Sequence, residues 1–231
     1  MLNYEIDPEV LRPYLPAGTE LDAWNGRTYV SMVAFLFLNT RVRGMAIPFH
    51  RNFEEINLRF YVRRRGPDGW QRGVVFVKEI VPRFAIAAMA RLFYNENYVA
   101  LPTRHKLEVS AESVMADYGW RLKGRWNRLR VKTTGSFKFV EPGSLEEFIT
   151  EHYWGYAAQG DGGCVEYRVA HPAWPIWQTE EAGLDCDVDA LYGDRFAAWL
   201  KAAPSSSFLA EGSEVTVLDG TKIKPVGTIR Q

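Results

Sequence analysis

FEEINLRFYV, residues 53–62, and GVVFVKEI, residues 73–80, are two extended runs joined by the turn sequence RGPDG at residues 65–69. Side chains alternate along a strand, so the first run divides into two faces. Ile56, Leu58, Phe60 and Val62 form an apolar face, and Glu55, Asn57, Arg59 and Tyr61 form a polar face. The apolar face is predicted to be core. The polar row sets an acid, an amide, a guanidinium and a phenol about 7 Å apart in succession, which suits either solvent or a ligand pocket.

The composition is that of an ordered globular protein. Hydrophobic residues make up 47% of the 231 residues, with 8 Trp, 11 Tyr and 13 Phe. We expect a single domain over residues 1–231. The 28 basic and 28 acidic residues cancel, so no global field attracts the chain to nucleic acid or to an anionic membrane.

Targeting and redox signals favour a cytoplasmic protein without a membrane span. The longest apolar run, residues 29–38, is half the ~20 residues that a membrane helix needs, and it is predicted to be a buried strand. The first ten residues carry acids where a signal peptide needs a basic and then an apolar segment. Cys164 and Cys186 fit no metal or redox spacing.

Turn signals divide most of the remaining chain into short strands. Asn25-Gly26, residues 160–163 and Asp219-Gly220 each predict a hairpin. Residues 107–140 alternate apolar and polar side chains between turns. Together these signals predict an α+β protein that is mostly antiparallel β.

A few helices are expected around the strands. Asp7 is a predicted N-cap before Pro8, and a last short helix is expected around residues 194–201. Residues 82–94 are apolar nearly all round except for Arg91, which must find a partner such as Glu55 if it is buried.

The clearest predicted helix covers residues 145–158. It follows a capping box formed by Ser144 and Glu147 and precedes Gly160 as a stop signal. His152 lies on its apolar stripe and is interpreted as a packed histidine.

Residues 121–132 form a two-stranded ribbon that is basic on one face. Binding of nucleic acid through such a ribbon requires a protein of net positive charge in which the ribbon is the main basic surface. Antiparallel sheets, in contrast, ordinarily turn one charged face to water. We therefore expect no nucleic-acid partner.

Common catalytic and cofactor signatures are absent from the sequence. It has no P-loop, no G-x-G-x-x-G, no G-x-S-x-G and no H-E-x-x-H. The four histidines have no metal-like spacing, so we expect neither a metal site nor a cofactor. They are His50, His105, His152 and His171.

The hairpin register decides which residue joins the polar row. A turn centred near residues 67–68 places Asn57 opposite Lys78, whereas a slip of one residue puts Glu79 there. Enclosure of Lys78 would lower its pKa and make it an amine nucleophile, while the plainer alternative is a lysine paired with Glu55 or pointing to solvent. The sequence leaves the register open.

Two interpretations of the row also stay open. Glu55 suits a general acid or base, and Arg59 suits a bidentate carboxylate clamp. The alternative is a purely structural ion-pair network of Glu55 with Arg59 or Arg91.

Several stretches resemble the YqjF-like family of uncharacterised proteins, within the acetoacetate-decarboxylase-like superfamily. They are GMAIPFHRNFEEINLRFYV (residues 44–62), RGVVFVKEIVPR (72–83), ARLFYNENY (90–98) and HPAWP (171–175), together with the opening residues 3–18. The resemblance covers nearly the whole chain. It implies an antiparallel sheet closed into a cone or barrel with a few peripheral helices, and an active site inside.

The resemblance also implies a change in chemistry. The decarboxylase forms a Schiff base on the first of two adjacent lysines, and these positions are Tyr98 and Val99 here. An arginine near its N-terminus corresponds to Glu5. Only its glutamate on the central strand is kept, as Glu55. The resemblance therefore supports the fold and a pocket, and it argues against Schiff-base decarboxylation.

The sequence thus predicts a pocket for a small organic acid or carbonyl compound, with Glu55 as the catalytic group if the protein is an enzyme. The alternative is a non-catalytic module for ligand sensing or for homo-oligomerisation through exposed aromatic side chains. The expected ligand-binding residues are Asn57, Arg59, Tyr61, Lys78, Arg91, Tyr94 and Tyr98.

Overall fold

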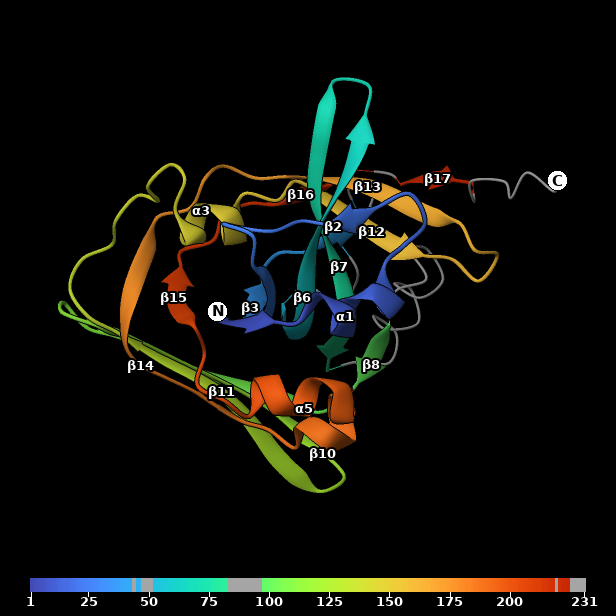
Figure 1. Cartoon of the computed structure of the whole chain (residues 1–231). Helices are drawn as coiled ribbons and strands as arrows, with labels where there is room; N and C mark the ends of the chain where they lie inside the picture. The colour runs from blue at the N-terminus through green and yellow to red at the C-terminus, as the bar shows by residue number, and fades with distance from the viewer. Residues whose placement is uncertain (43–44, 47–51, 83–96, 219, 225–231) are drawn as a thin grey trace, which may run out of the picture.

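A computed structural model describes residues 1–42, 45–46, 52–82, 97–218 and 220–224 (Figure 1). In this part of the chain a 15-stranded sheet has the order β16-β13-β12-β7-β6-β3-β1-β15-β14-β11-β10-β9, with β17 on β13, β2 on β6 and β8 on β7. Its strands are β1 (Leu2–Ile6), β2 (Glu20–Leu21), β3 (Thr28–Phe37), β6 (Phe53–Gly66), β7 (Gly69–Val81), β8 (Tyr98–Ala100), β9 (Thr103–Val109), β10 (Val114–Leu122), β11 (Arg125–Thr133), β12 (Trp154–Ala158), β13 (Cys164–Ala170), β14 (Ile176–Asp185), β15 (Ser206–Ala210), β16 (Thr216–Val217) and β17 (Thr221–Ile223).

The other elements are few and short. β4 (Arg41–Val42) and β5 (Met45–Ala46) form a separate two-stranded sheet. The helices are α1 (Pro8–Leu11), the 3-10 helix η1 (Arg12–Tyr14), α3 (Leu145–Thr150), α4 (Val188–Tyr192) and α5 (Asp194–Leu200). Strand pairings are antiparallel except β12 with β7 and β7 with β8. The predicted fold class is confirmed.

The sheet bends strongly but stays open among the described strands. β16 and β9 end its order and do not pair with each other. Closure into a cone or barrel is therefore not confirmed. Figure 1 shows β10 and β11 crossing below α5, with β6 and β7 in the middle of the molecule.

The central hairpin has the predicted turn and an unpredicted bulge. Gly66 lies opposite Gly69, as a turn at residues 67–68 requires. The register then shifts between Leu58 and Arg59, because Val77 is an extra residue on β7. Beyond the bulge Leu58 lies opposite Lys78. The register with Lys78 opposite the polar row is therefore wrong, and the one-residue slip is correct.

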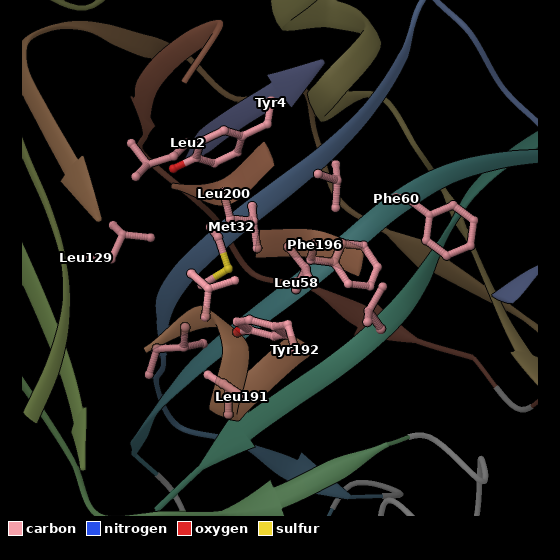
Figure 2. Packing of buried hydrophobic residues seen from close by; sticks show 14 of the residues in the cluster. Leu2, Tyr4, Met32, Leu58, Phe60, Leu129, Leu191, Tyr192, Phe196 and Leu200 are labelled. Carbon is pink, nitrogen blue, oxygen red and sulfur yellow. The ribbon is translucent and has the colours of Figure 1, made fainter. Parts of the chain in front are cut away.

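The main core lies on the apolar face of β6. Leu58 and Phe60 are fully buried there against Met32 of β3 and Leu191 and Phe196 of the helical pair α4–α5 (Figure 2). A smaller apolar cluster covers the opposite face under α3. Both faces of β6 are thus buried, which is unusual for a strand with four polar residues on one side.

The helix predicted over residues 145–158 is too long. Its N-cap is confirmed, since Ser144 Oγ accepts from Glu147 N at 3.1 Å, while Glu147 Oε2 accepts from Gly143 N at 2.7 Å and not from Ser144 N as in a full capping box. The helix ends at Thr150, and residues 154–158 form β12 instead. Gly73 of β7 permits this pairing, because a Cβ there would lie 2.6 Å from the Trp154 carbonyl oxygen. Sheet pairing overrides the local helical pattern.

The predicted C-terminal hairpin is also wrong. β16 and β17 do not pair with each other, and both pair with β13. Asp219 itself lies outside the described residues. β13 offers a long edge on which both short segments find hydrogen bonds, and a two-residue strand has little to gain from pairing with its neighbour.

Other local signals are confirmed. Asp7 caps α1 by accepting from Glu9 N at 2.9 Å. Asn25 and Gly26 have φ of 49° and 78° in a tight turn between Trp24 and Arg27. The helix expected over residues 82–94 falls on residues 83–96, which are outside the described part. No helix in the described part is long and apolar enough to cross a membrane.

Candidate polar site on the central strand

The polar row of β6 is buried inside the protein. Glu55, Asn57 and Tyr61 are 2%, 1% and 1% exposed, and Arg59 is half-buried. Alternation along the strand places these side chains together, because the bulge lies on β7 and leaves the two-residue period of β6 intact. The row faces protein and not bulk water.

One end of the row is acidic. Glu55 Oε1 accepts from Asn57 Nδ2 at 3.0 Å, and Glu55 Oε2 accepts from Tyr98 OH at 3.4 Å. Glu79, which is 1% exposed, lies opposite Asn57 on β7 and beside Tyr98 on β8. Three strands therefore bring two carboxyl groups, an amide and a phenol together. Such a group can accept, donate and transfer a proton.

The middle of the row carries a guanidinium. Arg59 Nη2 donates to Ile149 O at 3.3 Å, while Arg59 Nε is buried and finds no hydrogen-bond partner among the described residues. Within the same part of the chain no carboxylate forms an ion pair with Arg59. A half-buried guanidinium of this kind can receive the carboxylate of a ligand.

The other end of the row is held rigidly. Ser31 Oγ donates to Asn3 Oδ1 at 2.6 Å, so Tyr61 OH donates to Ser31 Oγ at 2.6 Å. The Tyr61 ring packs on His152, with centroids 4.7 Å apart, and on Phe148 of α3 at 5.2 Å. The phenol is therefore fixed by neighbours on both sides.

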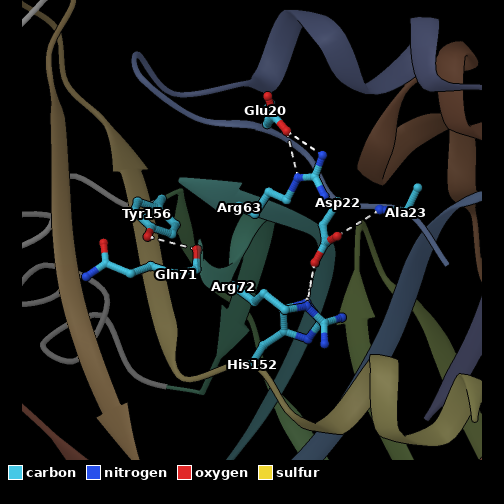
Figure 3. A network of polar contacts seen from close by, with 8 residues as sticks. All are labelled: Glu20, Asp22, Ala23, Arg63, Gln71, Arg72, His152 and Tyr156. Carbon is cyan, nitrogen blue, oxygen red and sulfur yellow. Dashed lines mark hydrogen bonds and ion pairs between the residues drawn. The ribbon is translucent and has the colours of Figure 1, made fainter. Parts of the chain in front are cut away.

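Asp22, Arg72 and His152 form a group of polar side chains (Figure 3), and the His152 ring of this group packs on Tyr61. Asp22 Oδ2 accepts from Arg72 Nε at 2.7 Å and lies 3.6 Å from His152 Nε2. Asp22 is held there by its backbone N–H, which donates to Tyr61 O at 3.0 Å. Sequence reasoning did not connect these three residues. They lie far apart in the chain and follow no shared pattern.

The pKa values in this group are shifted strongly. Burial lowers the pKa of His152 to about 4, against the opposing effect of Asp22. Burial would raise the pKa of Asp22, but the nearby His152 and the hydrogen-bonded Arg72 outweigh it and lower that pKa to about 2. His152 is therefore neutral at pH 7, and Asp22 is ionised and paired with Arg72. The interpretation of His152 as a packed histidine is confirmed, although not on a helix.

Lys78 does not belong to the polar row. Its side chain lies on the core side of β7, where Nζ donates to Leu191 O and is 5.7 Å from the centroid of the Tyr192 ring. Burial lowers its pKa. The bulge at Val77 is the physical reason, since it leaves Glu79 as the residue that faces the row. Arg91 and Tyr94, also predicted to bind ligand, lie outside the described residues.

The basic ribbon has acidic partners. Arg128 pairs with Asp117, and Lys132 pairs with Glu180 at 2.9 Å. Arg125 pairs with Asp185. These charges lie on an outer face of β10, β11 and β14, where cations and carboxylates alternate.

Two hollows lie on the surface away from Glu55. One, of about 320 Å³, follows Arg128, Arg130 and residues 181–185. The other, of about 250 Å³, lies over Asp22, Trp24 and Arg72 at the end of α3. Among the described residues no group of three or more His, Cys, Asp or Glu side chains is placed to hold a metal ion.

Solved structures share this architecture. The fold is similar to that of the enduracididine biosynthesis enzyme MppR complexed with pyruvate, with a TM-score of 0.65 and 15% identity over 98% of this chain and 88% of that chain. An acetoacetate decarboxylase-like enzyme from Sphingomonas wittichii RW1 gives 0.60 and 16% over 96% and 89%. The acetoacetate decarboxylase of Legionella pneumophila gives 0.55 and 13% over 96% and 78%. The fold is acetoacetate decarboxylase-like, and at these identities the similarity extends to the fold alone.

Sequence comparison gives the family. The model of the DUF2071 family, uncharacterized conserved proteins, matches residues 1–214, and the chain belongs to this family. It is 40% identical over 196 residues to the uncharacterized protein YqjF of Bacillus subtilis (strain 168), covering 82% of this chain and 75% of that protein. The expected YqjF-like resemblance is confirmed.

Proposed function

We propose that the polar row of β6 binds a small organic acid or carbonyl compound. The observation that carries the proposal is the burial of Glu55 in line with Arg59, a half-buried guanidinium without a carboxylate partner among the described residues. Holding a guanidinium half-buried without a carboxylate partner is costly, and a protein that gains nothing from it replaces it readily with an apolar side chain. A ligand that needs both ends of the row accounts for that cost.

The spacing suits a short ligand. Asn57 and Arg59 are two residues apart on one face, about 7 Å. A carboxylate held by the Arg59 guanidinium sets a carbonyl or hydroxyl group two or three bonds away against the Asn57 amide. Glu55 then lies next along the strand as proton acceptor or donor, with Tyr98 OH at 3.4 Å from its Oε2.

The proposed chemistry does not pass through a Schiff base. Tyr98 and Val99 stand at the positions where the resemblance expects two lysines. Lys78 lies on the opposite side of β7 and donates to Leu191 O. The structural neighbour MppR is described as complexed with pyruvate, which supports a keto acid as the first ligand class to test.

The test compares ligand-induced shifts of the melting temperature. Wild type, Glu55→Gln, Arg59→Met and the control Glu54→Gln are each measured against their own ligand-free protein, with a panel of keto and hydroxy acids. Glu54 is the matched control because it neighbours Glu55 on the strand and faces the other way, bonded to Thr103 and His105. Wild type and Glu54→Gln are expected to shift, and Glu55→Gln and Arg59→Met to shift much less.

Two further measurements sharpen the result. Arg59→Met is expected to lose its response to pyruvate and to keep a response to the uncharged pyruvamide, because only the carboxylate contact is removed. Ligand consumption followed by NMR separates an enzyme from the alternative, a module that binds without turnover. Equal shifts in wild type and Glu55→Gln across the panel contradict the proposal.

A further inference from the structure

β9 is the longer of the two strands that end the sheet. No strand in the described part of the chain pairs with its outer edge. Residues 104–109 are all exposed, and the pairing of β9 with β10 runs from Thr103 to Val109 without a bulge. A long, straight, exposed edge is a template for pairing with another strand.

The hydrogen-bond pattern identifies which backbone groups point outward. Ser110 N donates to Ser113 O at 2.9 Å, and Arg121 N donates to Pro102 O at 2.9 Å. Bonded positions alternate along an antiparallel pair, so residues 102, 104, 106, 108 and 110 bond to β10. The N–H and C=O groups of residues 103, 105, 107 and 109 point to the free edge.

The side chains of β9 are apolar on one face and charged on the other. Leu107 and Val109 are 45% and 76% exposed and lie on the face that continues the core side of β10, where Ala116 and Tyr118 are buried. Lys106 and Glu108 lie on the outer face and pair with each other. Extension of the sheet beyond β9 would cover Leu107 and Val109.

We propose that β9 pairs antiparallel with β9 of a second copy of this chain, about a twofold axis at Leu107. This interaction is independent of the proposed ligand site. Residues 105, 107 and 109 then bond to residues 109, 107 and 105 of the partner, which uses the outward groups of both strands. Leu107 lies beside its own copy, and Val109 lies beside the partner's His105.

Charge selects this register over its neighbours. With the axis at Leu107, each Lys106 lies opposite Glu108 of the other copy in a close, non-bonded pair. With the axis at Lys106 each Arg104 faces a Glu108 but the two lysines oppose each other, and with the axis at His105 each Arg104 opposes a Lys106, so of the three only the register at Leu107 has attractive pairs without a repulsive one. The strand is self-complementary in charge in the proposed register, which argues for a second copy as the occupant of the edge.

The first test is the oligomeric state of the full chain by sedimentation. Wild type is expected to form dimers, and Lys106→Glu is expected to raise the dimer dissociation constant roughly tenfold or more, because two cross-strand attractions become repulsions. Adding Glu108→Lys to Lys106→Glu is expected to restore the dimer. Wild type that stays monomeric overturns the proposal, and so does a dimer that is insensitive to the charge reversal.

The second test fixes the register by cross-linking Lys106→Cys and Glu108→Cys variants under oxidising conditions. In the proposed register Lys106 of one copy faces Glu108 of the other, so a mixture of the two variants is expected to form a disulfide-linked dimer, whereas neither variant does so alone. Cross-linking of Lys106→Cys alone overturns the proposed register. Wild type is the control for disulfides formed by the two native cysteines, which are Cys164, fully buried, and Cys186. A mixture that does not cross-link overturns the pairing.

Discussion

Acidification below pH 7 is expected to destabilise the protein through His152. The folded protein holds the pKa of His152 at about 4, below the 6.5 of an unperturbed histidine. As the pH falls, the unfolded chain therefore binds the proton first. The contribution of His152 to stability is complete above pH 6.5 and is lost as the pH falls toward 4.

The magnitude follows from the two pKa values. Proton linkage gives a loss of about 2 kcal/mol in the free energy of unfolding between pH 7 and pH 5, and about 3 kcal/mol by pH 4. Burial is the main cause of this shift in the pKa of His152, while Asp22 opposes it and the charges of Arg72 and Arg59 add to it. Asp22 has a folded pKa of about 2, so its own contribution is present above pH 3.8 and is lost only below it. The buried Met1 ammonium, whose pKa burial lowers to about 5, loses its own contribution in the same window, so the contribution of His152 is isolated by comparing wild type with His152→Phe.

The assay is urea unfolding followed by tryptophan fluorescence at pH 7, 6 and 5, for wild type, His152→Phe and the control His171→Phe. Phenylalanine keeps an aromatic ring against Tyr61 and Phe148, which lie 4.7 and 5.3 Å from the His152 ring. His152→Phe is expected to lose about 2 kcal/mol of the pH dependence between pH 7 and pH 5, and His171→Phe, an exchange in a ring stacked on Trp174 outside the core, is expected to retain it. Parallel stability curves for wild type and His152→Phe from pH 7 to pH 5 would refute the reasoning.

Three further predictions concern the central sheet. Gly73→Ala is expected to lower the free energy of unfolding by about 1 to 3 kcal/mol, because its Cβ would lie 2.6 Å from a backbone oxygen of β12; Gly183→Ala, in an open strand position, is the control in the same urea assay. Tyr61→Phe is expected to cost about 1 to 2 kcal/mol through the lost hydrogen bond to Ser31, measured by thermal unfolding, and an unchanged melting temperature would contradict the buried bond. Borohydride treatment with pyruvate is expected to leave the protein mass unchanged, and an adduct mapped to Lys78 would contradict its placement away from the polar row.

The two-residue period predicted correctly which side chains of β6 share a face, because β6 is an unbroken strand with both faces buried. Glu55, Asn57 and Tyr61 point together into the protein, as the two-residue period requires. The period and the turn signal together predict the pairing of β6 with β7 as far as Val77, where the bulge shifts the register. A bulge on β7 is decided by how that strand twists against its neighbours, and no residue type in GVVFVKEI marks it.

Interactions between distant segments explain the other failures. The sequence after Ser144 favours a long helix, and hydrogen bonds to β7 and β13 convert its second half into β12. The group of Asp22, Arg72 and His152 meets only once β2, β7 and the segment after α3 are in place. A sequence pattern describes a single helix or strand. Asp22, Arg72 and His152 come from three different segments, so no such pattern could predict their contacts.

The bulge at Val77 connects the fold with the proposed chemistry. Without the extra residue the hairpin would set Lys78 opposite Asn57, and a buried amine would lie in the polar row next to Glu55. With it, Glu79 takes that place and Lys78 turns to the end of α4, where its charge meets the Leu191 carbonyl. The row then presents carboxyl groups, an amide and a phenol, a set that suits proton transfer, and in the proposed function Arg59 holds the charge of an acid. One residue in β7 thus separates the lysine from the site that we propose.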